Sequence, residues 1–405
     1  MRFTSNVRAF YSFAREKTFM SHQSDHGRPM TMDEILQTSK KRYLRRSYKG
    51  KLGIQDFILL KILGTVSGIF FHLNARNGLN YVVNTSSALR STFARVWLVK
   101  LAHPAEEDRD KVYALKVLRK VDVIRLKQVD HVNSERKILA DVAGYPFITN
   151  LIASFSDRES LYMLLDYCPG GEIFSHLRRA KRFSEDYARF YVAEIVLILE
   201  YLHERKGVAY RDLKPENLLL DGEGHVKLVD FGFGKSLGQK ETYTLCGTPE
   251  YIAPEVIQSK GHTTAVDWWS LGILLFEFLT GYPPFWHKSN ALDVYKQILS
   301  KSIIFPTDID LSPEARDLIL QLCTVDRTKR LGNIVGGAAR VKSHPFFRGI
   351  NWQDVYIRKY CGPIIPVIRY SGDTKYFDHY PVDKYKTEPY SIDLERKWEH
   401  HFKGF

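Results

Sequence analysis

The chain has 405 residues, of which 44% are hydrophobic and 26% charged, and this balance excludes fibrous and fully disordered proteins. No stretch provides the roughly 18 uncharged apolar residues that a membrane span needs, and at about 150 residues per domain the length predicts two or three compact units. The four cysteines form no CxxC pair, which excludes a disulfide scaffold or a zinc ribbon and favours a reducing compartment.

Positive charge is concentrated in residues 1–56. The whole chain has 59 Lys and Arg against 46 Asp and Glu, a net charge of +13, and residues 1–56 contribute 12 − 5 = +7 of it. We interpret this segment as a basic, partly disordered extension with a solvated helix. An arm for nucleic acid or anionic lipid is the alternative, but no helix-turn-helix or aromatic and basic module follows. No nucleic-acid partner is therefore expected, and Arg2, where N-myristoylation needs glycine, predicts no membrane anchor.

The hydrophobic pattern changes character near residues 166–171. Before this point, short apolar or alternating runs predict one helix at 126–140 and strands at 57–63, 93–100, 112–118, 152–155 and 161–166. After it, apolar residues at helical spacing predict helices at 190–203, 265–279 and 313–322. The sequence therefore predicts an α+β fold with a strand-rich lobe, a helix-rich lobe and a ligand-binding cleft between them.

Short motifs in the second part of the chain carry reactive residue types in a fixed order. Asp212 lies five residues before Asn217 in the sequence YRDLKPEN, and the sequence DFG at 230–232 follows Asp212 by 18 positions. The sequence APE closes the series. With Lys116 on a predicted strand and Glu135 on the predicted helix after it, these motifs form the signature set of protein kinases.

The chemistry of phosphoryl transfer explains these residue types, because positioning and charge neutralisation supply most of the catalysis. Lys116 would neutralise the α- and β-phosphates of ATP, and Glu135 would hold Lys116 by an ion pair. Asp230 and Asn217 offer the hard oxygen ligands that Mg²⁺ prefers. Asp212 would accept the hydroxyl proton of the substrate and orient the nucleophile. The predicted cofactors are therefore ATP and Mg²⁺.

Longer stretches of the chain carry a more specific resemblance. They are CGTPEYIAPE at 246–255, DWW at 267–269, GYPPF at 281–285, FSHLRR at 174–179 and the final FKGF. With these stretches the chain resembles the AGC group of Ser/Thr protein kinases, and within it the catalytic subunits of cAMP-dependent protein kinase of the fungal type. The resemblance runs from about residue 57 to the last residue and implies the bilobal protein-kinase fold.

The resemblance also implies the domain boundaries. The kinase domain is expected at 57–347, after the basic extension at 1–56, and the AGC tail at 348–405. Within the kinase domain, the expected parts are an N-lobe at 57–165, a hinge at 166–171 and a C-lobe at 172–347.

Roles for further residues follow from the resemblance. Lys214 and Thr248 match catalytic residues that mark Ser/Thr kinases, and Phe377 matches a tail aromatic residue that contacts adenine. Phe402 and Phe405 match a terminal Phe-x-x-Phe motif that docks onto the small lobe. The residues that the resemblance assigns to nucleotide binding are Leu63, Gly64, Val96, Ala114, Lys116, Leu165, Asp166, Cys168, Glu172, Glu216, Leu219 and Phe377.

Regulation and substrate choice are implied in the same way. Thr244 matches the family's activating phosphorylation site, and a phosphate there would add negative charge that nearby cations can pair with. The residues that match its phosphate contacts are Arg211, Lys235 and His131. Carboxylates hold guanidinium groups bidentately, so acids at the substrate site would select basic peptides of the type Arg-Arg-x-Ser/Thr. The acids that match are Glu172, Glu216, Glu250 and Glu277.

The glycine-rich loop departs from the family pattern. The family expects Gly-x-Gly-x-x-Gly between the first two strands, but here Leu63, Gly64 and Thr65 are followed by 26 residues, 66–91, before the sequence TFARV resumes. The third glycine is Ala94. We interpret 66–91 as a retained intron in the gene model, with a real insertion as the alternative. A real insertion would cost only ~2 kcal/mol in loop closure, but it would disturb the backbone that covers the phosphates.

The sequence therefore predicts a Ser/Thr protein kinase that uses Mg-ATP on basic sequences. Leu245 and Ile252 match the family's docking surface for a cAMP-binding regulatory subunit, which is the expected partner besides peptide substrates. A cytoplasmic location is expected, with the nucleus left open as a second one. The alternative is a catalytically impaired kinase-fold binding protein, in which the interrupted glycine-rich loop prevents transfer. A nucleic-acid binder that uses residues 1–56 is a third interpretation.

Overall fold

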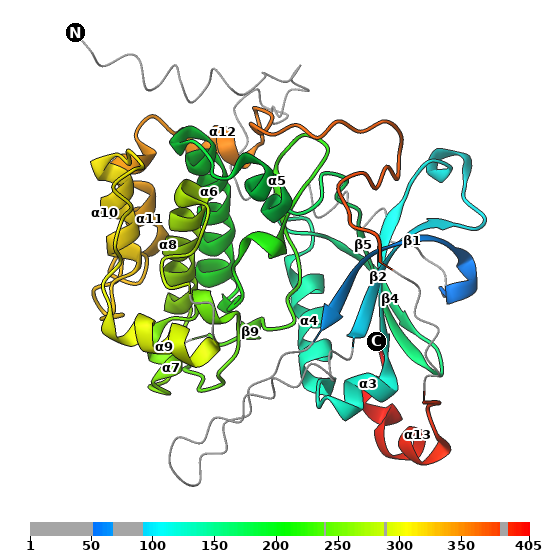
Figure 1. Ribbon diagram of the computed structural model, residues 1–405. Coiled ribbons are helices and arrows are strands. Elements are labelled where there is room, and N and C mark those ends of the chain that lie inside the picture. The colour runs from blue at the N-terminus through cyan, green and yellow to red at the C-terminus, as the bar shows by residue number, and fades with distance from the viewer. Residues whose placement is uncertain (1–51, 68–91, 239, 287–289, 381–387) are drawn as a thin grey trace, which may run out of the picture. The chain divides into compact units, whose positions relative to one another are not determined.

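A computed structural model describes residues 52–67, 92–238, 240–286, 290–380 and 388–405. The interrupted glycine-rich loop at 68–91 and the basic extension before residue 52 lie outside the described residues. The described chain forms two compact units (Figure 1). The sheet unit contains the residues up to Gly171 together with 230–232 and 367–405, and the helical unit contains residues 172–229 and 233–366.

The sheet unit is built on one five-stranded antiparallel sheet with the strand order β1-β2-β3-β5-β4. The strands are β1 (Phe57–Ser67), β2 (Thr92–Leu101), β3 (Tyr113–Arg119), β4 (Leu151–Ser156) and β5 (Ser160–Asp166). The central strand β3 pairs with β2 on one side and β5 on the other, so Lys116 lies opposite Val96 and Met163. The predicted strand-rich first part of the chain is therefore confirmed.

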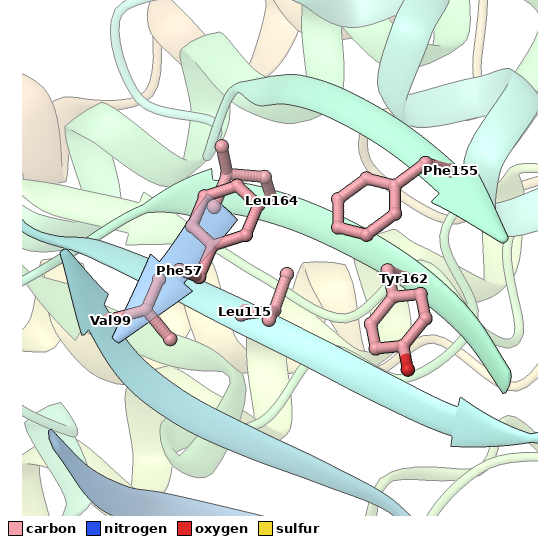
Figure 2. Packing of buried hydrophobic residues seen from close by; sticks show 6 residues of the cluster. All are labelled: Phe57, Val99, Leu115, Phe155, Tyr162 and Leu164. Carbon is pink, nitrogen blue, oxygen red and sulfur yellow. The ribbon is translucent and has the colours of Figure 1, made fainter. Parts of the chain in front are cut away.

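One face of this sheet buries an apolar cluster that fixes its register (Figure 2). Phe155 stacks on Phe57 and on Tyr162, with ring centroids 5.7 and 4.8 Å apart. Val99, Leu115 and Leu164 complete the cluster, and Val99 and Leu115 have no exposed surface. A slip of one residue would turn these side chains to the opposite face, so the cluster fixes the register that places Lys116.

Two helices follow β3 in the sheet unit, α3 (Lys120–Arg125) and α4 (Val129–Val142). The sequence predicted one helix that begins at residue 126, and this start is wrong. Lys127 has a φ of 56°, in the left-handed region, which interrupts the helical backbone between α3 and α4. The tail adds α13 (Ile392–Trp398), which is followed by the short helix η7 (Glu399–Phe402). Two further short helices are η1 (Ile54–Asp56) and η2 (Glu106–Asp108).

The helical unit is packed around α8 (Ala265–Thr280), in which every residue is buried. Its other α-helices are α5 (Ile173–Ala180), α6 (Glu185–Glu200), α7 (Pro254–Ile257), α9 (Ala291–Ser300), α10 (Pro313–Leu322), α11 (Gly337–Lys342) and α12 (Trp352–Tyr356). A π-helix, η3 (Tyr201–Arg205), continues α6. The predicted helix-rich second part is confirmed, and α10 has the predicted bounds. No described helix is both long enough and apolar enough to cross a membrane.

Short strands and turns in the helical unit carry the motif residues. The two antiparallel pairs are β6 (Val208–Ala209) with β9 (Lys235–Ser236), and β7 (Leu218–Leu220) with β8 (Val226–Leu228). Three single turns are η4 (Pro215–Asn217), η5 (Pro249–Tyr251) and η6 (Pro345–Phe347). Each begins with proline, whose fixed φ favours the start of a helical turn.

A buried ion pair holds α7 to the segment before α11. Arg330 has no exposed surface, and its two terminal nitrogens donate to the two carboxylate oxygens of Glu255 at 2.6 and 2.9 Å. Two parallel bonds of this kind combine charge with fixed geometry. The APE sequence is therefore anchored in the core of the helical unit by its glutamate.

Candidate functional site

The sheet unit brings one lysine and two carboxylates together. Lys116 on β3 is 4% exposed, and its Nζ lies 2.6 Å from Oε1 of Glu135 on α4 and 3.2 Å from Oδ1 of Asp230. Burial alone would lower the pKa of Lys116, but the attraction of Asp230 and Glu135 outweighs it and raises the pKa above its ordinary value. Lys116 therefore stays charged, as a residue that pairs with phosphates must.

The backbone around Asp230 holds this carboxylate in an unusual position. Asp230 has a φ of 54°, and the amide of Gly232 donates to its Oδ1 at 3.3 Å. A Cβ at position 232 would lie 3.2 Å from that oxygen, so glycine leaves the carboxylate room. Phe231 between them is fully buried. The side chain of Asp230 is still 32% exposed, whereas that of Glu135 is 3% exposed, so Asp230 is the carboxylate that a ligand can reach.

The helical unit brings a second set of four residues together around Asp212, which is 5% exposed. Asn217 Nδ2 donates to Oδ2 of Asp212 at 2.9 Å, and Thr248 Oγ1 donates to Oδ1 at 2.8 Å. Lys214 Nζ lies 2.9 Å from Oδ2 of Asp212 and donates to Thr248 Oγ1 at 2.8 Å. The aspartate, the asparagine, the lysine and the threonine thus form one hydrogen-bonded network.

The loop that carries Asp212 is held by a buried carboxylate on α8. Asp267 has no exposed surface and accepts from the backbone amides of Tyr210 and Arg211 at 2.9 and 2.7 Å. Its Oδ2 also lies 2.7 Å from Nε2 of His203. Arg211 has a φ of 69°, and these bonds help to fix that strained turn. Sequence reasoning had noted Asp267 only within the DWW motif and missed this positioning role.

The four acids predicted at the substrate site all lie in the helical unit. Two of them, Glu277 and Glu216, are described first. Glu277 on α8 is 2% exposed, its Oε1 lies 3.1 Å from Nη2 of Arg178, and its Oε2 accepts from the hydroxyl of Tyr251. Burial raises the pKa of Glu277 and also that of Glu216 on η4. Glu216 Oε2 is buried without a partner in the described part of the chain.

The other two acids are placed by short backbone elements. Glu172 is the residue before α5 and forms an isolated antiparallel bridge with Leu219 on β7, which places Glu172 and Leu219 next to each other. Glu250 lies on η5, directly after Thr248 and Pro249. All four acids therefore belong to the same unit as Asp212.

The segment that carries Thr244 lies beside basic side chains of the helical unit. Thr244 is exposed, and its hydroxyl lies 3.5 Å from that of buried Thr242, which accepts from Lys235 Nζ at 2.8 Å. Arg211 donates through Nε to the carbonyl of Phe233 at 2.8 Å. His131, the third predicted contact, belongs to α4 of the sheet unit, where its Nδ1 lies 2.7 Å from Oε1 of Gln128. Lys235 thus bonds to the threonine segment directly, and Arg211, whose charge acts on Lys235, belongs to the same unit.

Five of the twelve residues that the resemblance assigns to nucleotide binding gather in one apolar cluster of the sheet unit, whereas Glu172, Glu216 and Leu219 belong to the helical unit. Leu63 and Ala114 are buried there with Leu98, and the side chains packed against them include those of Val96, Leu165 and Phe377. Gly64 lies next to Leu63 on β1, and Asp166 at the end of β5 accepts from Asn150 Nδ2. Cys168 is buried.

The tail is fastened to this cluster by polar and aromatic contacts. The ring of Phe377 stacks on that of Tyr167, with centroids 5.7 Å apart, and the Tyr167 hydroxyl donates to the carbonyl of Asp373 at 2.7 Å. Gly171 has a φ of 67°, and a Cβ there would lie 2.6 Å from the carbonyl oxygen of Tyr376. The close approach of the tail therefore requires glycine at this position.

The two terminal phenylalanines lie against the helices of the sheet unit. Phe402 is 2% exposed, and Nζ of fully buried Lys120 lies 5.5 Å from its ring centroid. The same ammonium group lies 2.7 Å from Oε1 of Glu399, which secures the tail by an ion pair. The guanidinium of Arg136 on α4 lies 5.4 Å from the ring centroid of Phe405. Both aromatic rings therefore contact cations of the sheet unit.

Comparison with known proteins decides the family. Residues 98–347, more than half of the chain, match the family described as Protein kinase domain. The chain belongs to the protein kinase family. The match begins after the interrupted glycine-rich loop, so family membership does not depend on residues 66–91.

Curated relatives of this kinase confirm the predicted resemblance. It is 46% identical over 344 residues to the cAMP-dependent protein kinase catalytic subunit of Dictyostelium discoideum, covering 84% of this chain and 51% of that protein. It is 51% identical over 296 residues to the cAMP-dependent protein kinase catalytic subunit PRKX of Homo sapiens, covering 73% of this chain and 80% of that protein. It is 42% identical over 359 residues to the cAMP-dependent protein kinase type 3 of Saccharomyces cerevisiae, covering 87% of this chain and 81% of that protein. The kinase thus spans about half the length of the Dictyostelium relative.

Proposed function

We propose that this kinase transfers the γ-phosphate of ATP to Ser or Thr in basic peptides, as a catalytic subunit of the cAMP-dependent type. The observation that carries the proposal is the pairing of a charged lysine with an accessible carboxylate in one unit and a networked aspartate in the other. The names of the curated relatives support it. The alternative of an impaired binding protein finds no support in them.

The donor set of the kinase fits Mg²⁺ and the phosphates of ATP. The carboxylate of Asp230 is partly exposed. Asn217 donates through Nδ2 to Asp212, so its side-chain oxygen Oδ1 is the atom that can bind the metal. The amide of Val229 donates to the carbonyl of Asn217 at 3.0 Å, and Asp230 follows Val229 by one peptide bond. The resemblance assigns Asp230 and Asn217 to magnesium, and we propose both as its ligands. The bound ion would neutralise charge on the transferring phosphate.

The residues of the chain divide the catalytic work. Lys116 would hold the α- and β-phosphates, and Glu135 would keep its ammonium group in place. Asp212 would accept the substrate hydroxyl proton at one of its carboxylate oxygens, which Thr248 and Asn217 orient. Lys214, bonded to the same carboxylate, would neutralise the transferred phosphate as it arrives. The apolar cluster with Phe377 would receive the adenine ring and exclude water from it.

Phosphate transfer to a basic peptide tests this function directly. We expect the purified full-length kinase to incorporate radiolabelled phosphate from ATP into a peptide that contains Arg-Arg-x-Ser, and to need Mg²⁺ for it. A matched chain that lacks residues 66–91 serves as the control for the interrupted loop. Transfer by the shortened chain alone would support the impaired-kinase alternative for the full-length chain, and transfer by neither chain would contradict the proposed function.

Recognition of arginine by Glu216 and Glu277 gives a second expected result. Replacing Glu216 with Gln should raise the KM for an Arg-Arg-x-Ser peptide roughly 10-fold or more, because charge-assisted bonds contribute about 1.5–3 kcal/mol. The KM for ATP is measured as well, because the resemblance also assigns Glu216 to nucleotide binding, and a rise in that KM alone would count against arginine recognition. With a peptide whose arginines are replaced by alanines, the KM of the variant should be close to that of the unmodified kinase, and this peptide serves as the control. Equal KM values for both peptides with the unmodified kinase would remove the basis for this assignment.

A regulatory subunit is the partner that the relatives' names suggest. Leu245 and Ile252, the residues that match its docking surface, are 8% and 4% exposed, so this part of the proposal rests on the relatives and not on an exposed apolar surface. We also propose a cytoplasmic location, which the scattered spacing of the four cysteines, without a CxxC pair, supports.

A further inference from the structure

Two buried nitrogen atoms beneath the Thr244 segment have no partner in the described part of the chain. They are Nε2 of His262 and Nη1 of Arg211, and the two residues are 1% and 8% exposed. A buried polar group without a hydrogen bond is costly and rare in folded proteins. The charge of Arg211 acts on His262, so the two residues are neighbours, and two such atoms near one segment indicate a site for a group that this chain lacks before modification.

Backbone bonds fix His262 to the threonine segment. The amide of His262 donates to the carbonyl of Thr242 at 2.9 Å, and the amide of Thr242 donates to the carbonyl of His262 at 3.0 Å. A Cβ at Gly261 would lie 2.5 Å from Oε2 of Glu241, so the two segments approach as closely as glycine permits. Arg327 closes the arrangement, because it donates to the Gly261 carbonyl at 3.1 Å and to Glu241 at 2.7 Å.

The charges around His262 decide its protonation before modification. The pKa of His262 is lowered to about 4, mainly by burial and next by the positive charge of Arg211. The charge of Lys235 acts in the same direction. Glu255 and Asp267 act against them and are outweighed. Both acids already have partners, since Glu255 pairs with Arg330 and Asp267 accepts from the catalytic loop. At neutral pH His262 is therefore uncharged, and the pocket has excess positive charge from Arg211 and Lys235.

We propose that His262 is a proton-carrying ligand of the phosphate on Thr244, and that it makes the ordering of this segment dependent on pH. The idea rests on the proposed function, in which Thr244 is the activating phosphorylation site. A phosphate on Thr244 adds up to two negative charges and three acceptor oxygens. The dianion favours the imidazolium form of His262, which then donates from Nε2 to a phosphate oxygen while Arg211 donates from Nη1. His262 gains one N–H bond with a proton taken up from hydronium or a buffer acid in the solvent, whose conjugate base stays in solution, and no bond between heavy atoms changes.

Titration of single histidines in the full-length kinase tests the proposal. The pKa of His262 is read by hydrogen exchange at the imidazole C2 position, followed by mass spectrometry, with the Thr244 phosphate present and after phosphatase treatment. We expect phosphorylation to raise it from about 4 by roughly two to three units, to pH 6 or above, since one opposite charge shifts a pKa by up to about this much and the phosphate carries nearly two. The internal control is His344, which is buried, lies 3.0 Å from Asp317 on α10 and should not respond to the phosphate.

A variant gives a second readout that does not depend on the titration. His262→Gln keeps a polar side chain but cannot carry the proton. At pH 6 we expect phosphatase to remove the Thr244 phosphate roughly 10-fold faster from this variant than from the unmodified kinase, the effect of one charge-assisted bond. The sign follows from the raised pKa, because the proton is bound below it and lost as the pH rises through it. At pH 8 the two rates should therefore converge.

The outcomes separate the two ideas. An unchanged His262 titration in a chain shown by mass spectrometry to carry phosphate on Thr244 would overturn the inference and leave the proposed function intact. Active kinase without phosphate on Thr244 would refute both the assigned regulation and the inference. Equal phosphatase rates for the variant and the unmodified kinase at pH 6 would also count against His262 as a phosphate ligand.

Discussion

Replacing Asp212 with Asn should lower kcat for peptide phosphorylation by about 10²- to 10⁴-fold, the usual contribution of a positioned general base. The amide has nearly the same shape and can still interact with Asn217 and Thr248, so the loop should keep its conformation. What is lost is the negative oxygen that accepts the hydroxyl proton. Steady-state kinetics at saturating ATP and peptide measure the effect, and the KM for ATP should change little.

The matched control for this variant is Asp308→Asn, which makes the same chemical change at an exposed position of the helical unit. It should keep kcat within about twofold, because surface substitutions away from special features have small effects. Unfolding in urea should give similar midpoints for both variants. A kcat for Asp212→Asn that equals that of the control would mean that the network around Asp212 is structural and that proton acceptance lies elsewhere.

Local motif order predicted the part of the candidate site whose residues lie close together in the sequence. Asp212, Lys214 and Asn217 lie within one loop, and their network follows directly from that spacing. The bounds of α10 were equally predictable, since Ser312 precedes Pro313 and its hydroxyl caps the helix by accepting from Ala315. In these places the local chemistry and the tertiary structure favour the same conformation.

Other features depend on contacts between distant segments, which no local pattern reveals. Asp267 is 56 residues from Arg211, whose amide it binds, and its role requires the buried position of α8. The bridge between Thr242 and His262 and the unpartnered nitrogens below it arise in the same way. The left-handed φ of Lys127 placed the start of α4 later than the apolar spacing predicted, because that spacing does not report single backbone angles. The missed features are thus those that only the folded chain creates.

Replacing Lys116 with Met should have the second large effect, on activity and on stability together. We expect kcat/KM for ATP to fall roughly 10²- to 10³-fold, as when one preorganised charged or polar donor is removed from an active site. The free energy of unfolding should also fall, by about 3–5 kcal/mol at most, because Glu135 is left buried without its cation. Steady-state kinetics with varied ATP measure the change in kcat/KM, and unfolding in urea measures the change in the free energy of unfolding.

A second substitution tells the two effects apart. In the double variant Lys116→Met with Glu135→Gln, the remaining buried side chain is neutral, so most of the lost stability should return. Activity should not return, because the phosphates still lack the ammonium group that β3 presents between Glu135 and Asp230. If the double variant regained activity with its stability, Lys116 would act only by keeping the sheet unit folded, and the phosphate-binding role proposed for it would have to pass to another cation.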